Sequence, residues 1–191
     1  MQPAGHLRRS QMTRVIHLVL LLAVIHQLLG SEVMQRPFPG DPPGWALLLH
    51  EYVGLGSLAV VGLFWLWTLL RRRETRLSRL VPWLSIARTR DVFADLAWQL
   101  NRLAHLRPPA DDDGALASAV HGLGLLAVTA MAVTGTVTWC DHGALAAHYA
   151  LDLHKLIANL VWAYLIGHAG LAVLHHLFGS DIFSRMFWTR R

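Results

Sequence analysis

The chain has 191 residues, of which 54% are hydrophobic and only 15% are charged, and its formal net charge is +5. Because an ordinary soluble domain carries roughly 25% charged residues, this composition excludes a water-facing globule, and it is too apolar for a disordered chain. The single cysteine, Cys140, excludes a disulfide scaffold, a haem attached through Cys-x-x-Cys-His and thiolate-held zinc or iron–sulfur clusters. Histidine is unusually frequent, since it occurs 12 times, as often as Asp and Glu together.

Four long apolar stretches follow one another, at about residues 15–34, 45–70, 115–139 and 149–178. Each reaches the roughly 20 residues that cross a bilayer as a helix, and none shows the period-two alternation of a strand. We therefore expect an all-α integral membrane four-helix bundle, with residues 1–191 forming a single domain. We expect the first stretch to be a retained helix and not a cleaved signal peptide, because two histidines lie inside it.

Basic residues predict the orientation of these spans. Fifteen of the 17 basic residues lie before the first span, between the second and third, or after the fourth. The positive-inside rule then places both termini and the loop 71–114 on the cytoplasmic side of the membrane. The basic excess thus indicates topology and requires no nucleic-acid partner. The flanking residues are Arg8, Arg9, Arg14, Arg71, Arg72, Arg73, Arg76, Arg79, Arg88, Arg90, Arg102, Arg107, Arg185, Arg190 and Arg191.

The cytoplasmic loop contains one helical pattern, from Thr89 to Leu106. Its apolar residues recur at helical spacing and form one stripe flanked by arginines. This pattern predicts an amphipathic helix that lies on the membrane surface or against a partner. The stripe comprises Val92, Phe93, Leu96, Ala97, Leu100, Leu103 and Ala104.

Five histidines lie well inside the spans, where an ionisable side chain is costly and is therefore a functional candidate. They are His17, His50, His121, His154 and His168. On the fourth span, His154 and His168 are 14 residues apart, which leaves them within about 40° of one helix face and about 21 Å apart along the axis. One face of this helix thus presents an imidazole near each side of the membrane.

Matching depths predict how these histidines pair. His50 and His154 each follow the outer start of their span by five residues, and we expect them to form an outer pair. His17, near the inner end of the first span, is the expected inner partner of His168, with His175 or His121 as alternative inner ligands. Two facing imidazoles fill both axial positions of a haem iron and give an electron carrier without an open oxygen site. Small residues that would let a flat macrocycle approach the helices are Gly54, Gly56, Gly135, Gly167 and Gly170.

The ordered motifs resemble the prokaryotic cytochrome b561 family and the wider clan of di-haem membrane cytochromes b. This clan includes the membrane subunits of respiratory formate dehydrogenases and nickel–iron hydrogenases. The resemblance covers all four spans. It rests on Arg14-Val-Ile-His17, Leu49-His50-Glu51, His121-Gly-Leu-Gly, Thr134-Gly135, Leu153-His154-Lys155 with the step to His168, His175-His176 and Asp181-Ile-Phe-Ser-Arg185-Met186.

The resemblance implies two b-type haems, ligated from the first, second and fourth spans, and exchange of electrons with a quinone pool. The 44-residue loop 71–114 is similar to the dehydrogenase-associated subunits. It therefore favours a subunit that passes electrons between a redox partner and quinone over a stand-alone superoxide:quinone oxidoreductase.

Further roles follow for residues near the two expected haems. Arg14 is a candidate to neutralise inner haem propionates, and His121 or His175 could contact a propionate or quinone. Lys155, the only lysine, either extends to the outer interface or meets an anionic group at the outer haem. A different class of function, a transporter whose histidines relay protons or bind a divalent metal, is disfavoured because the spans contain no carboxylate cluster.

Overall fold

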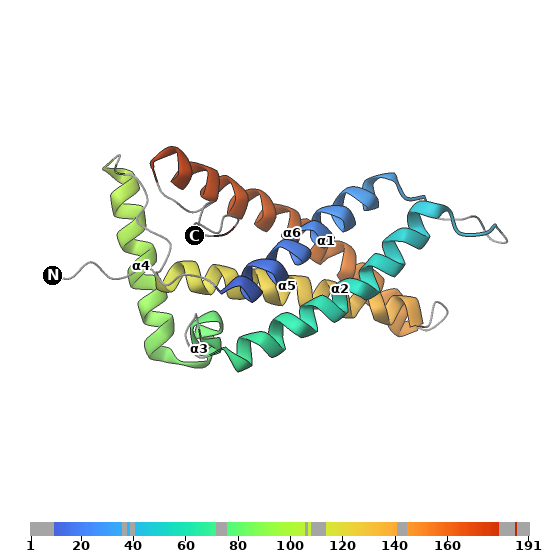
Figure 1. Ribbon diagram of the computed structural model, residues 1–191, viewed down its shortest axis with the longest axis horizontal. Helices are drawn as coiled ribbons and strands as arrows, with labels where there is room; N and C mark the ends of the chain where they lie inside the picture. Colours follow the sequence, from blue (N-terminus) through green and yellow to red (C-terminus); the bar gives the residue numbers. More distant parts are fainter. Residues whose placement is uncertain are drawn as a thin grey trace. The chain divides into compact units, whose positions relative to one another are not determined.

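The structure, a computed structural model, describes residues 10–35, 38, 41–71, 76–105, 107, 114–140, 145–179 and 186. Within them every regular element is a helix, which confirms the all-α prediction (Figure 1). Several predicted features lie outside the described residues. These are Leu106, the motif 181–185 and the flanking arginines Arg8, Arg9, Arg72, Arg73, Arg185, Arg190 and Arg191.

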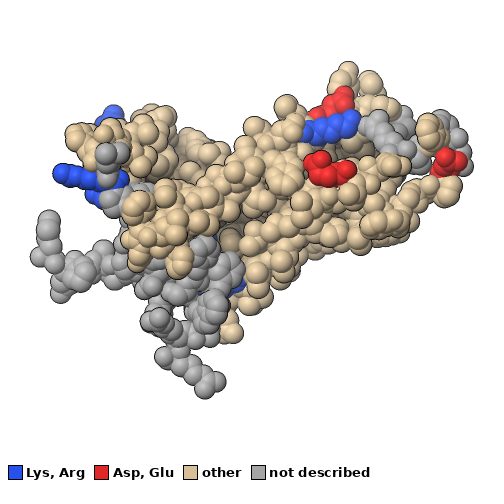
Figure 2. Space-filling model, turned by 90° about the horizontal axis from the view of Figure 1, so that it is seen from above, with Lys and Arg blue, Asp and Glu red and all other residues tan. Residues whose placement is uncertain are grey.

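Four helices are long and apolar enough to cross a membrane, as the hydropathy of the sequence predicts. They are α1 (Gln11–Val33), α2 (Trp45–Leu70), α5 (Ala115–Cys140) and α6 (Leu145–Leu177). On the face shown in Figure 2, charged side chains are few and most of the surface over the helices is uncharged. The chain is therefore a multi-pass membrane protein whose helix surfaces contact lipid.

Two spans begin about one turn earlier than the hydropathy indicates. Helix α1 starts at Gln11 because Ser10 caps it, its hydroxyl oxygen accepting a hydrogen bond from the backbone N–H of Thr13 over 3.2 Å. Helix α6 starts at Leu145, within the segment 145–148 that hydropathy leaves outside the span.

The described part of the loop between α2 and α5 holds three further helical elements: α3 (Leu77–Leu80), the 3-10 helix η1 (Pro82–Leu84) and α4 (Ile86–Ala104). The predicted loop helix is confirmed as α4, but the predicted stripe is divided between two environments. Val92 and Leu96 are half-buried, whereas Phe93, Leu100 and Leu103 are exposed. An apolar surface of α4 is therefore left for lipid or a partner.

The contacts of the chain form two compact units. The loop unit comprises Met1–Arg14, Trp67–Gly124 and Leu165–Arg191, and the cavity unit comprises Val15–Leu66 and Leu125–Tyr164. Each membrane helix contributes one segment to each unit.

The loop unit is held together by contacts between the loop and the start of α5. The carboxylate of Asp95 on α4 accepts a hydrogen bond from the backbone N–H of Leu116 over 2.9 Å. The backbone of Leu80 lies against Gly122, where a side-chain Cβ would overlap its carbonyl oxygen. In Figure 1, α4 runs at a steep angle to the beginning of α5.

The cavity unit packs small and apolar side chains between its helices. Leu28, Val61, Leu125, Ala147 and Val161 are almost fully buried. The indole N–H of Trp65 on α2 donates to the hydroxyl of Thr129 on α5 over 3.0 Å. These contacts fix the packing of the histidine-bearing helices within the cavity unit.

Candidate functional site

His50 of α2 and His154 of α6 lie opposite each other in the cavity unit. Their ring centroids are 6.2 Å apart and their planes are nearly perpendicular, at 81°. Both side chains are half-buried. The structure therefore brings together the two residues that the sequence pairs by depth.

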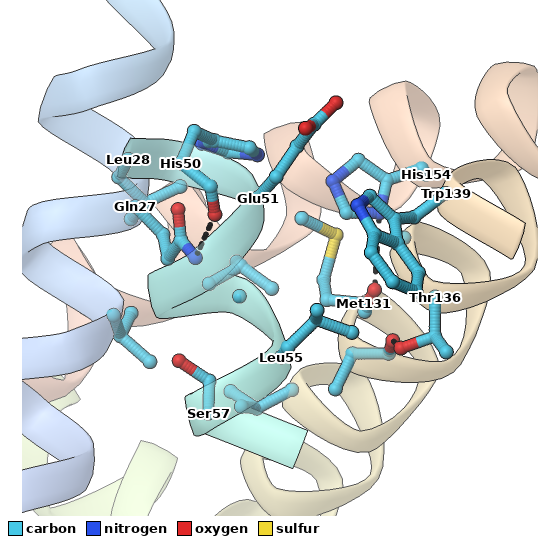
Figure 3. Close-up of a pocket in the computed structure, with 16 residues that line it drawn as sticks. Gln27, Leu28, His50, Glu51, Leu55, Ser57, Met131, Thr136, Trp139 and His154 are labelled. Atoms are coloured by element: carbon cyan, nitrogen blue, oxygen red, sulfur yellow. Dashed lines mark hydrogen bonds between the residues drawn. The ribbon is translucent and has the colours of Figure 1, made fainter. Parts of the chain in front are cut away.

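A cavity of about 100 Å³ adjoins the two rings (Figure 3). Its lining is mainly apolar and comes from α1, α2, α5 and α6. The residues that line it are Val24, Gln27, Leu28, His50, Glu51, Gly54, Leu55, Ser57, Val128, Met131, Ala132, Gly135, Thr136, Trp139, His154 and Val161.

The ring of His154 is held by α5. Its Nδ1 atom lies 3.0 Å from the backbone carbonyl oxygen of Met131 and 3.0 Å from the hydroxyl oxygen of Thr134. A carbonyl oxygen can only accept a hydrogen bond, so Nδ1 carries the proton and Nε2 keeps its lone pair. Neutral imidazole with a free Nε2 is the form that binds a metal ion.

His50 is held differently, through its backbone. The side-chain amide of Gln27 on α1 donates from Nε2 to the carbonyl oxygen of His50 over 2.8 Å. Among the described residues, neither the buried Nδ1 of His50 nor the buried Oε1 of Gln27 has a hydrogen-bond partner. The protein therefore fixes the main chain of this histidine, while the buried Nδ1 of its ring has no hydrogen-bond partner among the described residues.

The spacing of the two rings fits coordination of one iron. A metal–imidazole nitrogen bond is about 2.0 Å long, and the ring centroid lies about 1 Å beyond the nitrogen, so two centroids on opposite sides of one metal ion are about 6 Å apart. The observed 6.2 Å agrees with this value. The two rings are therefore spaced as two ligands of one metal ion would be.

A second pair of histidines lies in the loop unit. The rings of His121 on α5 and His168 on α6 are 5.1 Å apart at 83°. The Nδ1 atom of His121 is 2.6 Å from the carbonyl oxygen of Ala117, so it donates there and leaves Nε2 with its lone pair. His175, seven residues after His168, is buried. The two alternative inner ligands, His121 and His175, lie in the same unit as His168.

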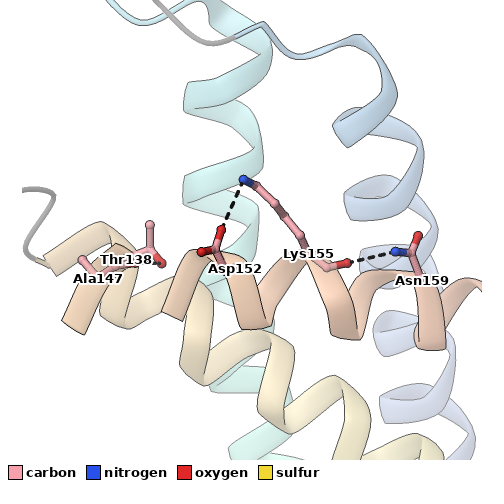
Figure 4. A network of polar contacts seen from close by, with 5 residues as sticks. All are labelled: Thr138, Ala147, Asp152, Lys155 and Asn159. Carbon is pink, nitrogen blue, oxygen red and sulfur yellow. Dashed lines mark hydrogen bonds and ion pairs between the residues drawn. The ribbon is translucent and has the colours of Figure 1, made fainter. Parts of the chain in front are cut away.

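The other predicted residues occupy varied positions. His17 belongs to the cavity unit and His168 to the loop unit, so their pairing stays a prediction. Arg14 is half-buried in the first turn of α1. Lys155 pairs with Asp152 over 3.8 Å, with 54% of its side chain exposed (Figure 4), and it does not line the cavity.

Of the five glycines predicted to let a macrocycle approach the helices, two lie against a residue of the site and three do not. A Cβ at Gly135 would lie 3.1 Å from the His154 ring, and one at Gly54 would lie 2.9 Å from Nε2 of Gln27. A Cβ at Gly56, Gly167 or Gly170 would meet nothing within 4 Å among the described residues.

Sequence reasoning missed two contributors to this site, Gln27 and the carbonyl of Met131. An amide side chain within an apolar span was a usable signal for Gln27. No sequence signal could identify Met131, because its contribution is a backbone oxygen.

Comparison with known proteins identifies the family of the chain. A family model described as prokaryotic cytochrome b561 matches residues 8–189. Comparisons with curated proteins and with solved structures found no significant match. The match covers all four membrane helices, so the chain belongs to the prokaryotic cytochrome b561 family and is a haem b-binding membrane cytochrome of electron transfer.

Proposed function

We propose that the protein carries two haem b groups and transfers electrons across the bacterial inner membrane between a redox partner subunit and the quinone pool. The observation that supports this proposal best is the 6.2 Å separation of the His50 and His154 rings. It matches the spacing required of two axial ligands on one iron.

The outer pair would hold its haem through Nε2 of each histidine. Haem b supplies a one-electron carrier when bound, and filling of both axial positions by imidazole leaves no open site on the iron. The chain's own residues determine the rest. The mainly apolar lining limits access of water, and Thr134, Met131 and Gln27 hold the two histidine-bearing segments.

For the inner site we propose His17 and His168 as axial ligands. His121 and His175 are the alternatives to either, and the 5.1 Å contact between His121 and His168 supports His121 as a group close to the inner haem. Single substitutions of His17, His121 and His175 distinguish these ligand sets. Only loss of a true ligand abolishes the low-spin spectrum of the inner haem.

The loop supports a partner subunit over a stand-alone oxidoreductase. Phe93, Leu100 and Leu103 of α4 are exposed, and so are Arg88 and Arg90 on the same helix. An exposed helix that carries apolar and basic side chains fits a membrane surface beside a docked protein. In the stand-alone alternative, the protein itself oxidises superoxide and passes the electron to quinone. The purified protein can be tested for this activity directly.

The deciding experiment is a reduced-minus-oxidised spectrum of the purified protein, combined with haem extraction. We expect b-type haem at two per chain, and absence of a Soret band under full haem supply would refute the proposal. Copurification with a peripheral redox subunit would support the subunit role. Rapid reduction of the isolated protein by superoxide, with quinone as the final acceptor, would support the alternative.

A further inference from the structure

We propose that α5, which supplies no ligand to the outer haem, positions His154 and lowers the reduction potential of that haem through Thr134 and Gly135. This inference rests on the proposed haem ligation by His50 and His154. It concerns residues that contact the ligand and not the iron, so they are positioning residues.

The first observation is the pair of oxygens at Nδ1 of His154. The carbonyl of Met131 and the hydroxyl of Thr134 each lie 3.0 Å away. The Thr134 hydroxyl donates its own proton to the carbonyl oxygen of Ala130 over 2.7 Å. Its lone pairs are therefore available to the Nδ1–H of His154, which is shared between the two oxygens.

The second observation is the tight contact between the ring and Gly135. A Cβ built at this glycine would lie 3.1 Å from Cε1 and 3.4 Å from Nδ1 of His154. The imidazole thus lies directly on the backbone of α5, next to Thr134, which is 8% exposed. Rotation of the ring toward α5 is blocked by the backbone, and rotation away breaks the hydrogen bonds at Nδ1.

These contacts have a chemical consequence for a bound iron. A ligating histidine that donates its second N–H to an oxygen acceptor is more basic and is fixed in orientation. A more basic ligand stabilises Fe(III) relative to Fe(II), which lowers the reduction potential. His50 has no such acceptor at Nδ1 among the described residues. The effect on the iron therefore comes through His154 on α6.

The experiment compares four variants in the full-length, haem-loaded protein. Thr134→Val keeps the shape but removes one of the two acceptors and leaves the Met131 carbonyl, and Thr134→Ser restores the hydroxyl. Thr138→Val is the matched control, because the Thr138 hydroxyl also donates to a carbonyl one turn earlier on α5, that of Thr134, over 3.0 Å, and Thr138 does not line the cavity. Gly135→Ala pushes against the ring without changing the acceptors.

Potentiometric titration and the EPR spectrum of the ferric protein provide readouts that a general loss of stability does not change. We expect Thr134→Val to raise the potential of the outer haem only and to weaken haem retention by about 10-fold. Thr134→Ser should return both to wild-type values, and Thr138→Val should leave them unchanged. Gly135→Ala should shift the outer EPR signal, which depends on the angle between the two imidazole planes.

Unchanged potential and EPR signal in Thr134→Val and Gly135→Ala, with outer haem still bound, would overturn the inference. If Thr134→Val retains no outer haem, rescue of haem binding by Thr134→Ser together with an EPR shift in Gly135→Ala would support the inference. Absence of both would overturn it. A wild-type protein that binds no haem at His50 and His154 would instead refute the proposed function.

Discussion

Gln27 and His50 are joined across two helices by a hydrogen bond of 2.8 Å from the side-chain amide to the backbone carbonyl. Gly54 lies beside this bond, since a Cβ there would lie 2.9 Å from the amide nitrogen of Gln27. Gly54→Ala should displace the amide and destabilise the cavity unit by about 1 kcal/mol, the usual net value of one buried hydrogen bond. The thermal midpoint of haem loss should fall.

Gly56→Ala is the matched control for this change, since a Cβ at Gly56 meets nothing within 4 Å among the described residues. It should leave the midpoint of haem loss unchanged. Equal midpoints for Gly54→Ala and the wild type would show that the Gln27 contact does not support the site.

Substitution of either outer histidine should remove one haem and leave the other. We expect His50→Leu and His154→Leu each to reduce extracted haem b from two per chain to one, because iron loses one of its two strong protein ligands. Pyridine haemochrome analysis against protein concentration measures the ratio. His105→Leu, on the exposed C-terminal end of α4, is the control and should retain both haems. A full haem complement in both outer variants would contradict the ligand assignment.

The hydrogen bond from Leu116 to Asp95 should stabilise the docking of α4. The carboxylate accepts from an N–H in the first turn of α5 over 2.9 Å and lies at the positive end of that helix. Asp95→Ala should cost about 1 kcal/mol, as loss of a helix cap does. Limited proteolysis of the loop in membranes should become faster. Asp91→Ala, one turn earlier and exposed, should not change the rate; equal rates for all three proteins would contradict the role of Asp95.

Gly122 should be the most sensitive glycine of the loop unit. A Cβ at this position would overlap the carbonyl oxygen of Leu80 and lie 2.6 Å from its carbonyl carbon, so backbone must move. Gly122→Ala should cost about 1–3 kcal/mol, the range for overpacking. The cost can be read from the thermal midpoint of the purified protein. Gly167→Ala, with nothing within 4 Å among the described residues, is the control, and equal midpoints for the two variants would argue against the Leu80 contact.

Cys140 provides a direct test of orientation. It is the only cysteine, it is exposed, and it ends α5. If both termini are cytoplasmic, α5 ends on the outer side. A membrane-impermeant maleimide should then label intact spheroplasts but not sealed inverted vesicles. Cys140→Ser gives the background. Labelling of inverted vesicles alone would reverse the predicted topology.

The membrane helices could be predicted from the sequence because hydropathy over 20 or more residues is a strong signal, whereas their ends could not. Helix α1 begins at Gln11 through a local cap by Ser10, and hydropathy does not detect a cap. The short helices α3 and η1 contain too few residues to show a period. Their positions depend on contacts such as that between Leu80 and Gly122.

The outer histidine pair could be predicted because equal depth on two spans restricts the possible partners. The groups that orient the pair could not. Met131 contributes only its carbonyl oxygen, which every residue possesses. Thr134 belongs to the motif Thr134-Gly135, but its hydroxyl bonds to a carbonyl one turn earlier like those of other threonines on α5, and its contact with His154 depends on the packing of α6.

The length of α6 has a consequence for the lipid around the protein. Its 33 residues span about 50 Å, while a hydrocarbon core is about 30 Å thick. Even at a tilt of about 40°, only about 40 Å of helix fits inside the core. About two turns of α6 must therefore extend into the headgroup region. Helix α1 has 23 residues and is about 35 Å long, which is only slightly more than the thickness of the hydrocarbon core. Changes in bilayer thickness should thus be absorbed by movement of the ends of α6 through the interface, while α1 sets the range of thicknesses in which the protein is well matched.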